Sequence, residues 1–214
     1  MTLNIKDKRI FIFDMDGTVV DTMGGYANLA GRLISERYDL DFVEAQEGYL
    51  QTSGVPFYQQ LDILFPGNKR NYETSVLFEI DKIKISKRAS LFPGLEELLR
   101  FIRLKGIIKI ISSNNFQKNV DVFIKKYPNL SFDLALGAKK DFKKGEKHLG
   151  YISRKFDVNK KSMLFIGDSL KDAENTLAFG VDFIAKTGTF TEERFKQCFP
   201  TIRCINNFKE LIYE

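Results

Sequence analysis

A short apolar run that ends in two acids constrains the fold of this chain more than any other feature. Residues 10–13 read Ile-Phe-Ile-Phe, and Asp14 and Asp16 follow directly after them. Gly17 and Thr18 come next, where the chain must turn. A strand that is apolar at every position is typically buried on both faces, as in parallel sheets. Ligands of open α/β sheets bind at the carboxyl ends of such strands. The two acids are therefore either costly neighbours or a catalytic and metal-binding pair, and we favour the pair.

The length and composition are those of an ordinary globular protein. The chain has 214 residues, 43% of them hydrophobic, which is enough for one substantial core or for a core domain with a small insert. No apolar run approaches the ~20 residues that span a bilayer. Residues 1–9 are polar and lack the apolar region of a signal peptide. We therefore expect a cytoplasmic protein with no membrane partner.

The charge of the chain slightly favours anionic ligands. The formal net charge is +5, and the basic residues are scattered apart from pairs at residues 139–140, 143–144 and 160–161. A solvated surface is the ordinary explanation of such pairs. We find no nucleic-acid-binding motif and no repeat of aromatic and basic residues, so we expect no nucleic acid partner.

Cysteine and histidine contribute nothing to the predicted site. Neither Cys198 nor Cys204 has another cysteine or a histidine at the spacing of a zinc site, so we expect two free thiols. The chain has a single histidine, His148, and we expect it to be an ordinary surface residue near the start of a helix.

Residues 22–88 form a helical block without a convincing strand. Apolar residues recur there at helical spacing, and we predict helices over residues 23–37, 42–50, 58–64 and 72–87. The last of these helices carries an apolar stripe of Val76, Leu77, Ile80 and Ile83. Because this block interrupts an otherwise alternating chain, we predict a small helical domain over residues 22–88. Residues 1–21 and 89–214 would form the core domain.

The core part alternates helices with short apolar strands. We predict strands over residues 107–111, 132–136, 163–166 and 181–185, and helices over residues 96–105, 116–127, 146–156 and 173–179. The second of these helices would bury Phe116, Val120, Phe123, Ile124 and Tyr127. A small strand around residues 202–205 and a terminal helix over residues 208–213 would follow. This alternation is typical of an α/β fold with a doubly wound parallel sheet, whose strands end at one common edge.

Polar residues follow four of the predicted strands. In chain order they are Asp14 and Asp16; Ser112, Ser113 and Asn114; Lys143 and Lys144; and Asp168 and Asp172. Each set is weak evidence alone, because a serine after a strand is usually a turn or cap residue and a lysine near a helix start is usually solvated. Their shared position at strand ends favours a single site.

These motifs resemble those of the haloacid dehalogenase superfamily of phosphohydrolases. The first motif reads Asp-Met-Asp-Gly-Thr at residues 14–18, the second is the apolar strand that ends in Ser112, and the fourth spans residues 167–172. The resemblance covers nearly the whole chain. It is to the branch with a small helical cap inserted after the first motif, which includes phosphoglycolate phosphatases and β-phosphoglucomutases. It implies a Rossmann-like core with residues 22–88 as the cap.

The third motif of that family is a lysine that proline usually follows. Here the loop reads Phe-Lys-Lys-Gly-Glu-Lys at residues 142–147, without a proline. Counting back from the apolar helical position Leu149 favours Lys144 as the matching lysine. Lys143 is the alternative, and Lys147 is a more distant one.

The resemblance implies that Asp14 is the nucleophile and Asp16 the general acid and base, with an aspartyl phosphate as the intermediate. A carboxylate that approaches a phosphate meets a repulsion of about 4 kcal/mol for each pair of unit charges at ~4 Å and an effective dielectric constant of about 20. Positive charge is therefore required, and Mg²⁺ suits oxygen ligands. Its implied ligands are the side chains of Asp14 and Asp168 and the backbone carbonyl of Asp16.

The remaining residues of the motifs would hold the phosphate. The resemblance implies that Ser112 and Lys144 bind its oxygens, the lysine as a point charge, with Thr18 and Ser113 beside them. Asp172 would be a supporting residue that orders the lysine or a metal-bound water.

The function that we predict is a Mg²⁺-dependent phosphatase for a small phosphorylated metabolite. The acid at Asp16 argues against a dehalogenase, since halide needs no proton in order to leave. A phosphomutase of the same fold is the first alternative, and the release of free phosphate would separate the two. A non-enzymatic protein that binds phosphate or a partner is the second, but binding alone does not need the second acid.

Overall fold

The computed structural model describes residues 5–212 of the chain. These residues fold into two compact units. Val20–Ser90 make up a helical unit, and the described residues on either side of that segment make up a unit built on a sheet. The sequence places the limits of the helical block at residues 22 and 88, each two residues inside the limits of this unit.

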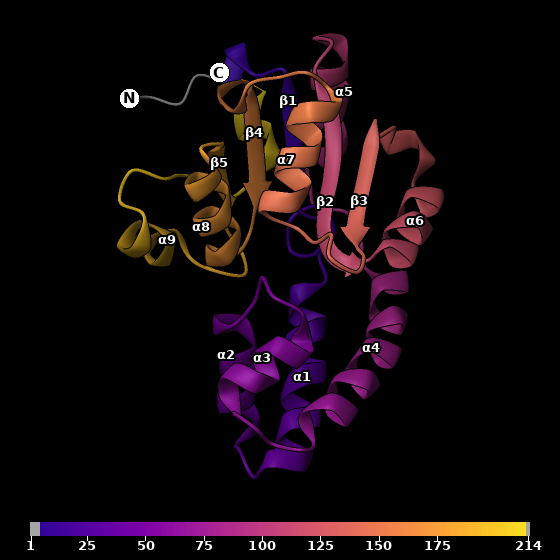
Figure 1. Cartoon of the computed structure of the whole chain (residues 1–214), viewed down its shortest axis with the longest axis vertical. Helices are drawn as coiled ribbons and strands as arrows, with labels where there is room; N and C mark the ends of the chain where they lie inside the picture. The colour runs from indigo at the N-terminus through magenta and orange to yellow at the C-terminus, as the bar shows by residue number, and fades with distance from the viewer. Residues whose placement is uncertain (1–4, 213–214) are drawn as a thin grey trace. The chain divides into compact units, whose positions relative to one another are not determined.

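The sheet of the first unit is parallel throughout (Figure 1). Its strand order is β3-β2-β1-β4-β5-β6. The central strand β1 pairs Ile12 with Ile110 of β2 on one side and with Phe165 of β4 on the other. All of β1 is buried, which explains its unbroken apolar run. The strands are β1 (Ile10–Phe13), β2 (Ile108–Phe116), β3 (Leu134–Ala138), β4 (Met163–Gly167), β5 (Asp182–Lys186) and β6 (Arg203–Ile205).

Helices connect consecutive strands of this sheet, so the predicted α/β class with a doubly wound parallel sheet is confirmed. Four of them lie near the predicted ranges. The helices are α5 (Leu95–Leu104), α6 (Gln117–Lys126), α7 (Glu146–Lys155), α8 (Leu170–Phe179) and α9 (Glu192–Cys198). Short 3₁₀ segments cover Ile5–Asp7, Pro128–Leu130, Lys160–Ser162 and Phe208–Leu211.

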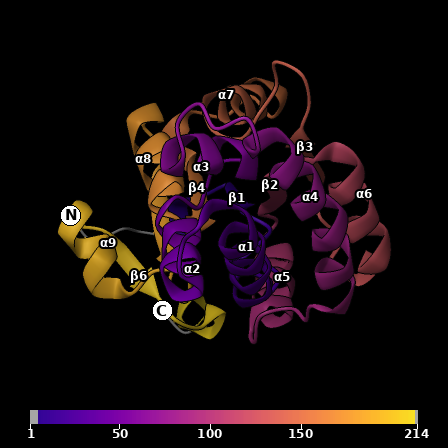
Figure 2. The same cartoon turned by 90° about the horizontal axis from the view of Figure 1, so that it is seen from below.

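Helices cover both faces of the sheet, and the side chains of β1 alternate between the faces. Ile10 and Ile12 join the core that Leu149 and Ile152 of α7 complete. Phe13 turns the other way, where its ring lies 6.3 Å from that of Phe208. Figure 2 shows α7 and α5 on opposite sides of the strands. The carboxyl ends of the strands are left for the loops that follow them.

The second unit consists of helices α1 (Met23–Tyr38), α2 (Phe42–Gln51), α3 (Phe57–Leu64) and α4 (Asn71–Arg88) around a core of their own (Figure 1). Aromatic rings contact one another in that core: the ring centroids of Phe57 and Phe78 lie 4.1 Å apart, and the ring of Tyr26 packs edge-on against that of Phe78 at 6.1 Å. The structure describes helices and no strand between Val20 and Ser90, as the sequence predicts.

Most of the apolar stripe of α4 does not face the core, and of its four residues only Leu77 packs against it. Val76, Ile80 and Ile83 are between 41% and 55% exposed, whereas Phe78 is buried. The helix faces the core with Phe78, whose ring lies among the other aromatic rings. On the same side, Thr74 accepts a hydrogen bond of 3.1 Å from the hydroxyl of Tyr38. Phe78 and Thr74 therefore belong to the inward face of this helix.

The second strand is longer than the sequence predicts. β2 continues through the polar residues 112–115 as far as Phe116, with a shift of register between Ser112 and Phe116. The prediction that Phe116 lies in the buried face of the next helix is therefore wrong, and its ring is 54% exposed. Of the other members of that face, Val120 and Phe123 are buried.

The end of the chain also differs from the prediction. Helix α9 was not predicted, and the segment after β6 is a 3₁₀ turn over Phe208–Leu211 rather than an α-helix; residue 213 of the predicted helix lies outside the described residues. Cys198 and Cys204 are free thiols, as expected, and Cys204 lies on β6. In the part of the chain that the structure describes, no helix is long and apolar enough to cross a membrane.

Candidate active site

The first acid stands at the carboxyl end of the central strand. The backbone N–H of Asp14 donates to the carbonyl of Ile166 on β4 at 2.9 Å, so the strand ladder holds this residue in place. Gly17 has a φ of 74° and reverses the chain where a side chain would be strained. Asp14 is 6% exposed, and Thr18 is fully buried. The strand and the turn thus hold a carboxylate in a nearly dry position.

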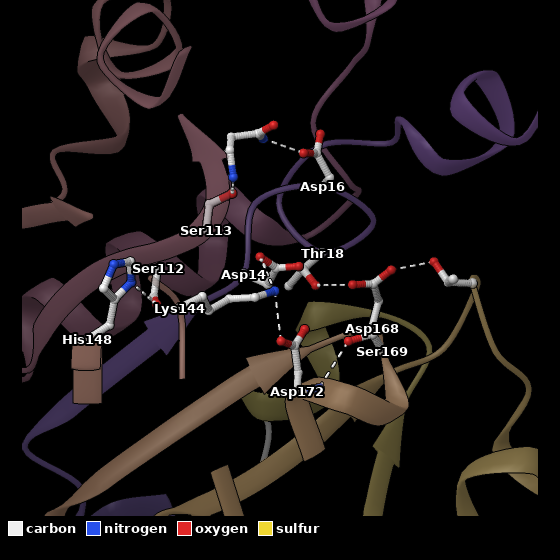
Figure 3. A network of polar contacts seen from close by, with 12 residues as sticks. Asp14, Asp16, Thr18, Ser112, Ser113, Lys144, His148, Asp168, Ser169 and Asp172 are labelled. Carbon is white, nitrogen blue, oxygen red and sulfur yellow. Dashed lines mark hydrogen bonds and ion pairs between the residues drawn. The ribbon is translucent and has the colours of Figure 1, made fainter. Parts of the chain in front are cut away.

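Lys144 is the lysine that reaches this carboxylate (Figure 3). Its Nζ atom lies 3.0 Å from Asp14 Oδ1 and 2.7 Å from Asp172 Oδ1. The side chain of Lys144 is 5% exposed, whereas Lys143 and Lys147 are exposed. Of the three lysines considered from the sequence, Lys144 is thus the one that the structure brings to the acids.

Gly145 explains why proline does not follow this lysine. Its φ is 101°, and α7 begins with the next residue, Glu146. Proline is restricted to a φ near −65°, so it could not take this conformation. The loop before the lysine is closed by paired backbone hydrogen bonds of 2.8 and 3.2 Å between Lys139 and Phe142.

Two further acids enter from the end of β4. Asp168 follows the last residue of that strand, and Ser169 caps α8 by accepting the backbone N–H of Asp172 at 3.1 Å. The cap places Asp172 in the first turn of the helix, with its side chain turned toward Lys144. Thr18 donates to Asp168 Oδ1 at 3.3 Å, and Thr189 donates to Asp168 Oδ2.

The electrostatics of the site show an excess of negative charge. Burial raises the pKa of Asp14 well above its usual value, against the opposing charge of Lys144. Burial, followed by the charge of Asp172, raises the pKa of Asp168 to about 6. Burial alone would lower the pKa of Lys144, but the charges of Asp14 and Asp172 outweigh it and hold that pKa above its usual value. One ammonium group therefore does not neutralise the buried acids.

The same acids fit a divalent cation. Asp14, Asp168 and Asp172 are all buried, and each offers an oxygen within 4.8 Å of the oxygens of the other two. Asp172 Oδ2 is buried without a hydrogen-bond partner, which leaves its charge uncompensated on that side. An all-oxygen donor set is the kind that Mg²⁺ prefers. Two of the three expected ligands, Asp14 and Asp168, belong to this group.

Asp16 is held by β2. The side-chain amide of Asn115 donates a hydrogen bond to Asp16 Oδ2 (Figure 3). The backbone N–H of Asn115 in turn donates to Ser113 Oγ at 3.1 Å. Ser113, expected beside the phosphate, thus supports the residue that contacts Asp16. Asn115 was missed as a site residue, although it ends the polar run 112–115.

His148 is not a surface residue, so that expectation is wrong. It is fully buried, and its Nδ1 atom lies 2.9 Å from Ser112 Oγ (Figure 3). Its position one helical turn before Ile152 places it on the inward face of α7, and its ring packs 4.6 Å from that of Phe142. The spacing of His148 to Ile152 is the sequence pattern from which its burial could have been predicted. Thr189, also missed, has no comparable signal because it lies in a loop beyond the motifs.

Known proteins resemble this chain in sequence and in fold. The family model of haloacid dehalogenase-like hydrolases matches residues 11–186. A haloacid dehalogenase-like hydrolase domain-containing protein of Arabidopsis thaliana is 29% identical over 182 residues, which cover 80% of this chain and 68% of that protein.

Solved structures agree with the architecture. A predicted phosphatase from Clostridium acetobutylicum superposes with a TM-score of 0.78 at 18% identity, over 95% of this chain and 96% of that one. A predicted phosphoglycolate phosphatase from Haemophilus somnus gives a TM-score of 0.73 at 18% identity, over 96% and 97% of the two chains. At this level of identity the likeness concerns the fold.

Proposed function

We propose that this chain, which belongs to the haloacid dehalogenase-like hydrolase family, is a phosphatase that releases phosphate from a small phosphorylated metabolite. The observation that carries the proposal is the position of Lys144, whose Nζ atom lies 3.0 Å from Asp14 Oδ1 and 2.7 Å from Asp172 Oδ1. A buried carboxylate beside a buried ammonium group offers a nucleophile together with a positive charge for the arriving phosphate.

Mg²⁺ is the cofactor that we propose. Asp14 and Asp168 would bind it through their side chains, and the backbone carbonyl of Asp16 would be the third protein ligand. The Oδ2 atom of Asp172 is buried without a hydrogen-bond partner, which favours a cation or a metal-bound water beside it. When bound, the ion would neutralise negative charge on the phosphate and orient it.

In the first proposed step an oxygen of Asp14 attacks the phosphorus. The bond between phosphorus and the ester oxygen breaks, and Asp16 gives its proton to the departing oxygen. Asn115 holds the Asp16 carboxyl in orientation through its hydrogen bond to Oδ2. Lys144 offsets the negative charges of the Asp14 carboxylate and of the phosphate that approaches it. The products are an aspartyl phosphate and a free alcohol.

In the second proposed step water attacks the same phosphorus. Asp16, now ionised, takes the proton of that water, and the bond between phosphorus and Asp14 breaks. Inorganic phosphate leaves, and the carboxylate of Asp14 and the acid form of Asp16 are restored. One group thus serves as acid and then as base.

Three hydroxyl groups surround these steps. We assign phosphate binding to Ser112, which follows the apolar run of β2. The hydroxyl of Thr18 donates to Asp168 and would orient that ligand, and Ser113 would act through Asn115. Thr18 and Ser113 would therefore act by holding other residues of the site.

Hydrolysis of nitrophenyl phosphate with Mg²⁺ tests the proposal, with the release of inorganic phosphate as the readout. Asp14→Asn is expected to lower kcat by ~10⁴-fold or more. Asp157→Asn is the matched control, because it removes an exposed carboxylate at a φ of 47° that asparagine tolerates. An inactive wild type, or full activity in Asp14→Asn, would overturn the proposal. A panel of phosphorylated metabolites would then identify the substrate, and an isomerised product without free phosphate would indicate a mutase.

A further inference from the structure

A buried histidine touches the serine of the phosphate site. His148 comes from the first turn of α7 and Ser112 from β2, and both side chains have 0% exposure. The distance between His148 Nδ1 and Ser112 Oγ is 2.9 Å, that of a good hydrogen bond. The steps proposed above make no use of this contact.

We infer that His148 is a positioning residue for Ser112: it donates its Nδ1–H to Ser112 Oγ, which leaves the serine proton for a phosphate oxygen of the substrate. The inference rests on the proposed function, in which Ser112 binds phosphate. It adds the group that decides in which direction the serine hydroxyl points.

If Ser112 donates to a phosphate, the donor and acceptor inventory of the two side chains requires this direction. A hydroxyl has one proton and can accept from two sides, whereas a phosphate offers mainly acceptors. If the Nδ1 atom of His148 accepted the serine proton, Ser112 would present only lone pairs to an anion. With the proton on Nδ1, the same serine becomes a donor to phosphate.

The surroundings of His148 keep its ring neutral, so that it carries a single proton. Burial lowers the pKa of His148 to about 4, and the charge of Lys144 lowers it further. The backbone of Gly137 and Phe142 raises this pKa, but by less than burial lowers it. At neutral pH the remaining choice is which of the two nitrogens carries the proton.

The other nitrogen is consistent with a proton on Nδ1. His148 Nε2 is buried and makes no hydrogen bond of good geometry. A buried N–H donor without a partner is rarer in proteins than an acceptor with unused capacity. A bare Nε2 is therefore the less costly state, and it leaves the proton on the nitrogen that faces Ser112.

A double-mutant cycle tests whether His148 acts through Ser112. The kcat/KM for nitrophenyl phosphate is compared in wild type, Ser112→Ala, His148→Leu and the double variant. His148→Leu is expected to cost ~10-fold in the wild-type background and less than ~2-fold once Ser112 is alanine. Equal losses in both backgrounds, or no loss in the first, would overturn the inference. A merely structural role of His148 would give equal losses.

A pair of polar variants provides the rescue. Asparagine places its amide where Nδ1 lies, and glutamine places it nearer to Nε2. His148→Asn is expected to stay within ~3-fold of wild type, and His148→Gln to behave like His148→Leu. Thermal unfolding reports whether each variant folds. If His148→Leu does not fold, the asparagine and glutamine variants test the inference in its place. Equal kcat/KM values for the asparagine and glutamine variants would contradict the inference.

A spectroscopic readout does not depend on turnover. The chain has one histidine, so its imidazole nitrogen resonances need no assignment by mutation. We expect Nδ1 to carry the proton when inorganic phosphate is bound, and the histidine spectrum of Ser112→Ala to respond little to phosphate. A bare Nδ1 in the phosphate-bound protein would overturn the inference. A wild type that binds phosphate and protonates Nδ1 but hydrolyses no ester would instead overturn only the proposed function.

Discussion

The ammonium group of Lys144 lies 3.0 Å from Asp14 Oδ1, on the carboxylate that we propose as the nucleophile. Asp172 holds the same ammonium group from another side at 2.7 Å. The charge that must compensate an arriving phosphate is therefore in place before any substrate binds, which is the arrangement that electrostatic catalysis requires. This relationship leads to the first prediction.

Replacing Lys144 with alanine is expected to lower kcat/KM for nitrophenyl phosphate by ~10²–10³-fold, because the phosphate would then meet Asp14 without its cation. Lys143→Ala is the matched control: the neighbouring lysine is exposed and should leave kcat/KM within ~2-fold of wild type. Steady-state kinetics of both variants check the prediction. Similar losses in the two variants would show that general surface charge, rather than the contact with Asp14, matters.

The acid role of Asp16 predicts a dependence on the leaving group. An alkoxide is a poor leaving group and needs a proton, whereas nitrophenolate leaves without one. Asp16→Asn should therefore slow an alkyl phosphate by ~10²–10⁴-fold and nitrophenyl phosphate by considerably less. Comparing kcat/KM for the two esters in wild type and variant measures the difference, because kcat/KM covers the steps up to departure of the alcohol and not the later hydrolysis, in which Asp16 acts as the base. Equal losses for both esters would rule out proton donation by Asp16.

The acidic group predicts stabilisation by the metal. A ligand at about 100 times its Kd stabilises the folded state by about 2.7 kcal/mol, which corresponds to ~5–10 °C in Tm for a chain of this length. Mg²⁺ is expected to raise Tm by about that amount at neutral pH, and EDTA to reverse the change. Asp168→Asn should abolish it, since that residue is a proposed ligand. An Asp168→Asn variant with the full Mg²⁺ effect would contradict the ligand assignment.

The pH dependence of the metal-free protein follows from Asp168. Burial raises the pKa of Asp168 to about 6, so the folded state binds more protons than the unfolded state between about pH 4 and about pH 6. The contribution of this group to the free energy of unfolding therefore falls as pH rises through that window. Asp168→Asn should remove the fall, and its stability relative to wild type should be greater at pH ~7 than at pH ~4. Denaturant titrations at several pH values, without metal, measure this difference. A difference that does not change with pH would contradict it.

The sequence predicts those parts of the fold and site that depend on local pattern. The apolar run of residues 10–13 specifies a strand buried on both faces, and the acid at its end then has to lie at the carboxyl edge. The family resemblance calls for a lysine in this loop, and the helical phase of Leu149 selects Lys144, which a single residue of slippage would have moved to Lys143. In each case neighbouring residues carry enough information.

The rest depends on contacts between segments that lie far apart in the sequence. The spacing of His148 to Ile152 indicates an inward position, but nothing near it in the sequence indicates its hydrogen-bond partner Ser112, which lies 36 residues away. Thr189 reaches Asp168 from a loop 21 residues further on. The polar run after Ile111 looks like a loop, but pairing with β3 extends it as strand. Tertiary partners override local propensity at these places.

The most direct test of the account is the covalent state of Asp14 during turnover. Wild type is mixed with excess nitrophenyl phosphate and Mg²⁺, quenched with acid within the first turnovers, digested, and analysed by mass spectrometry. The account predicts a phosphoryl group on the peptide that contains Asp14, and none in Asp14→Asn. Rapid hydrolysis by wild type with no phosphoryl group on that peptide at any quench time would contradict it.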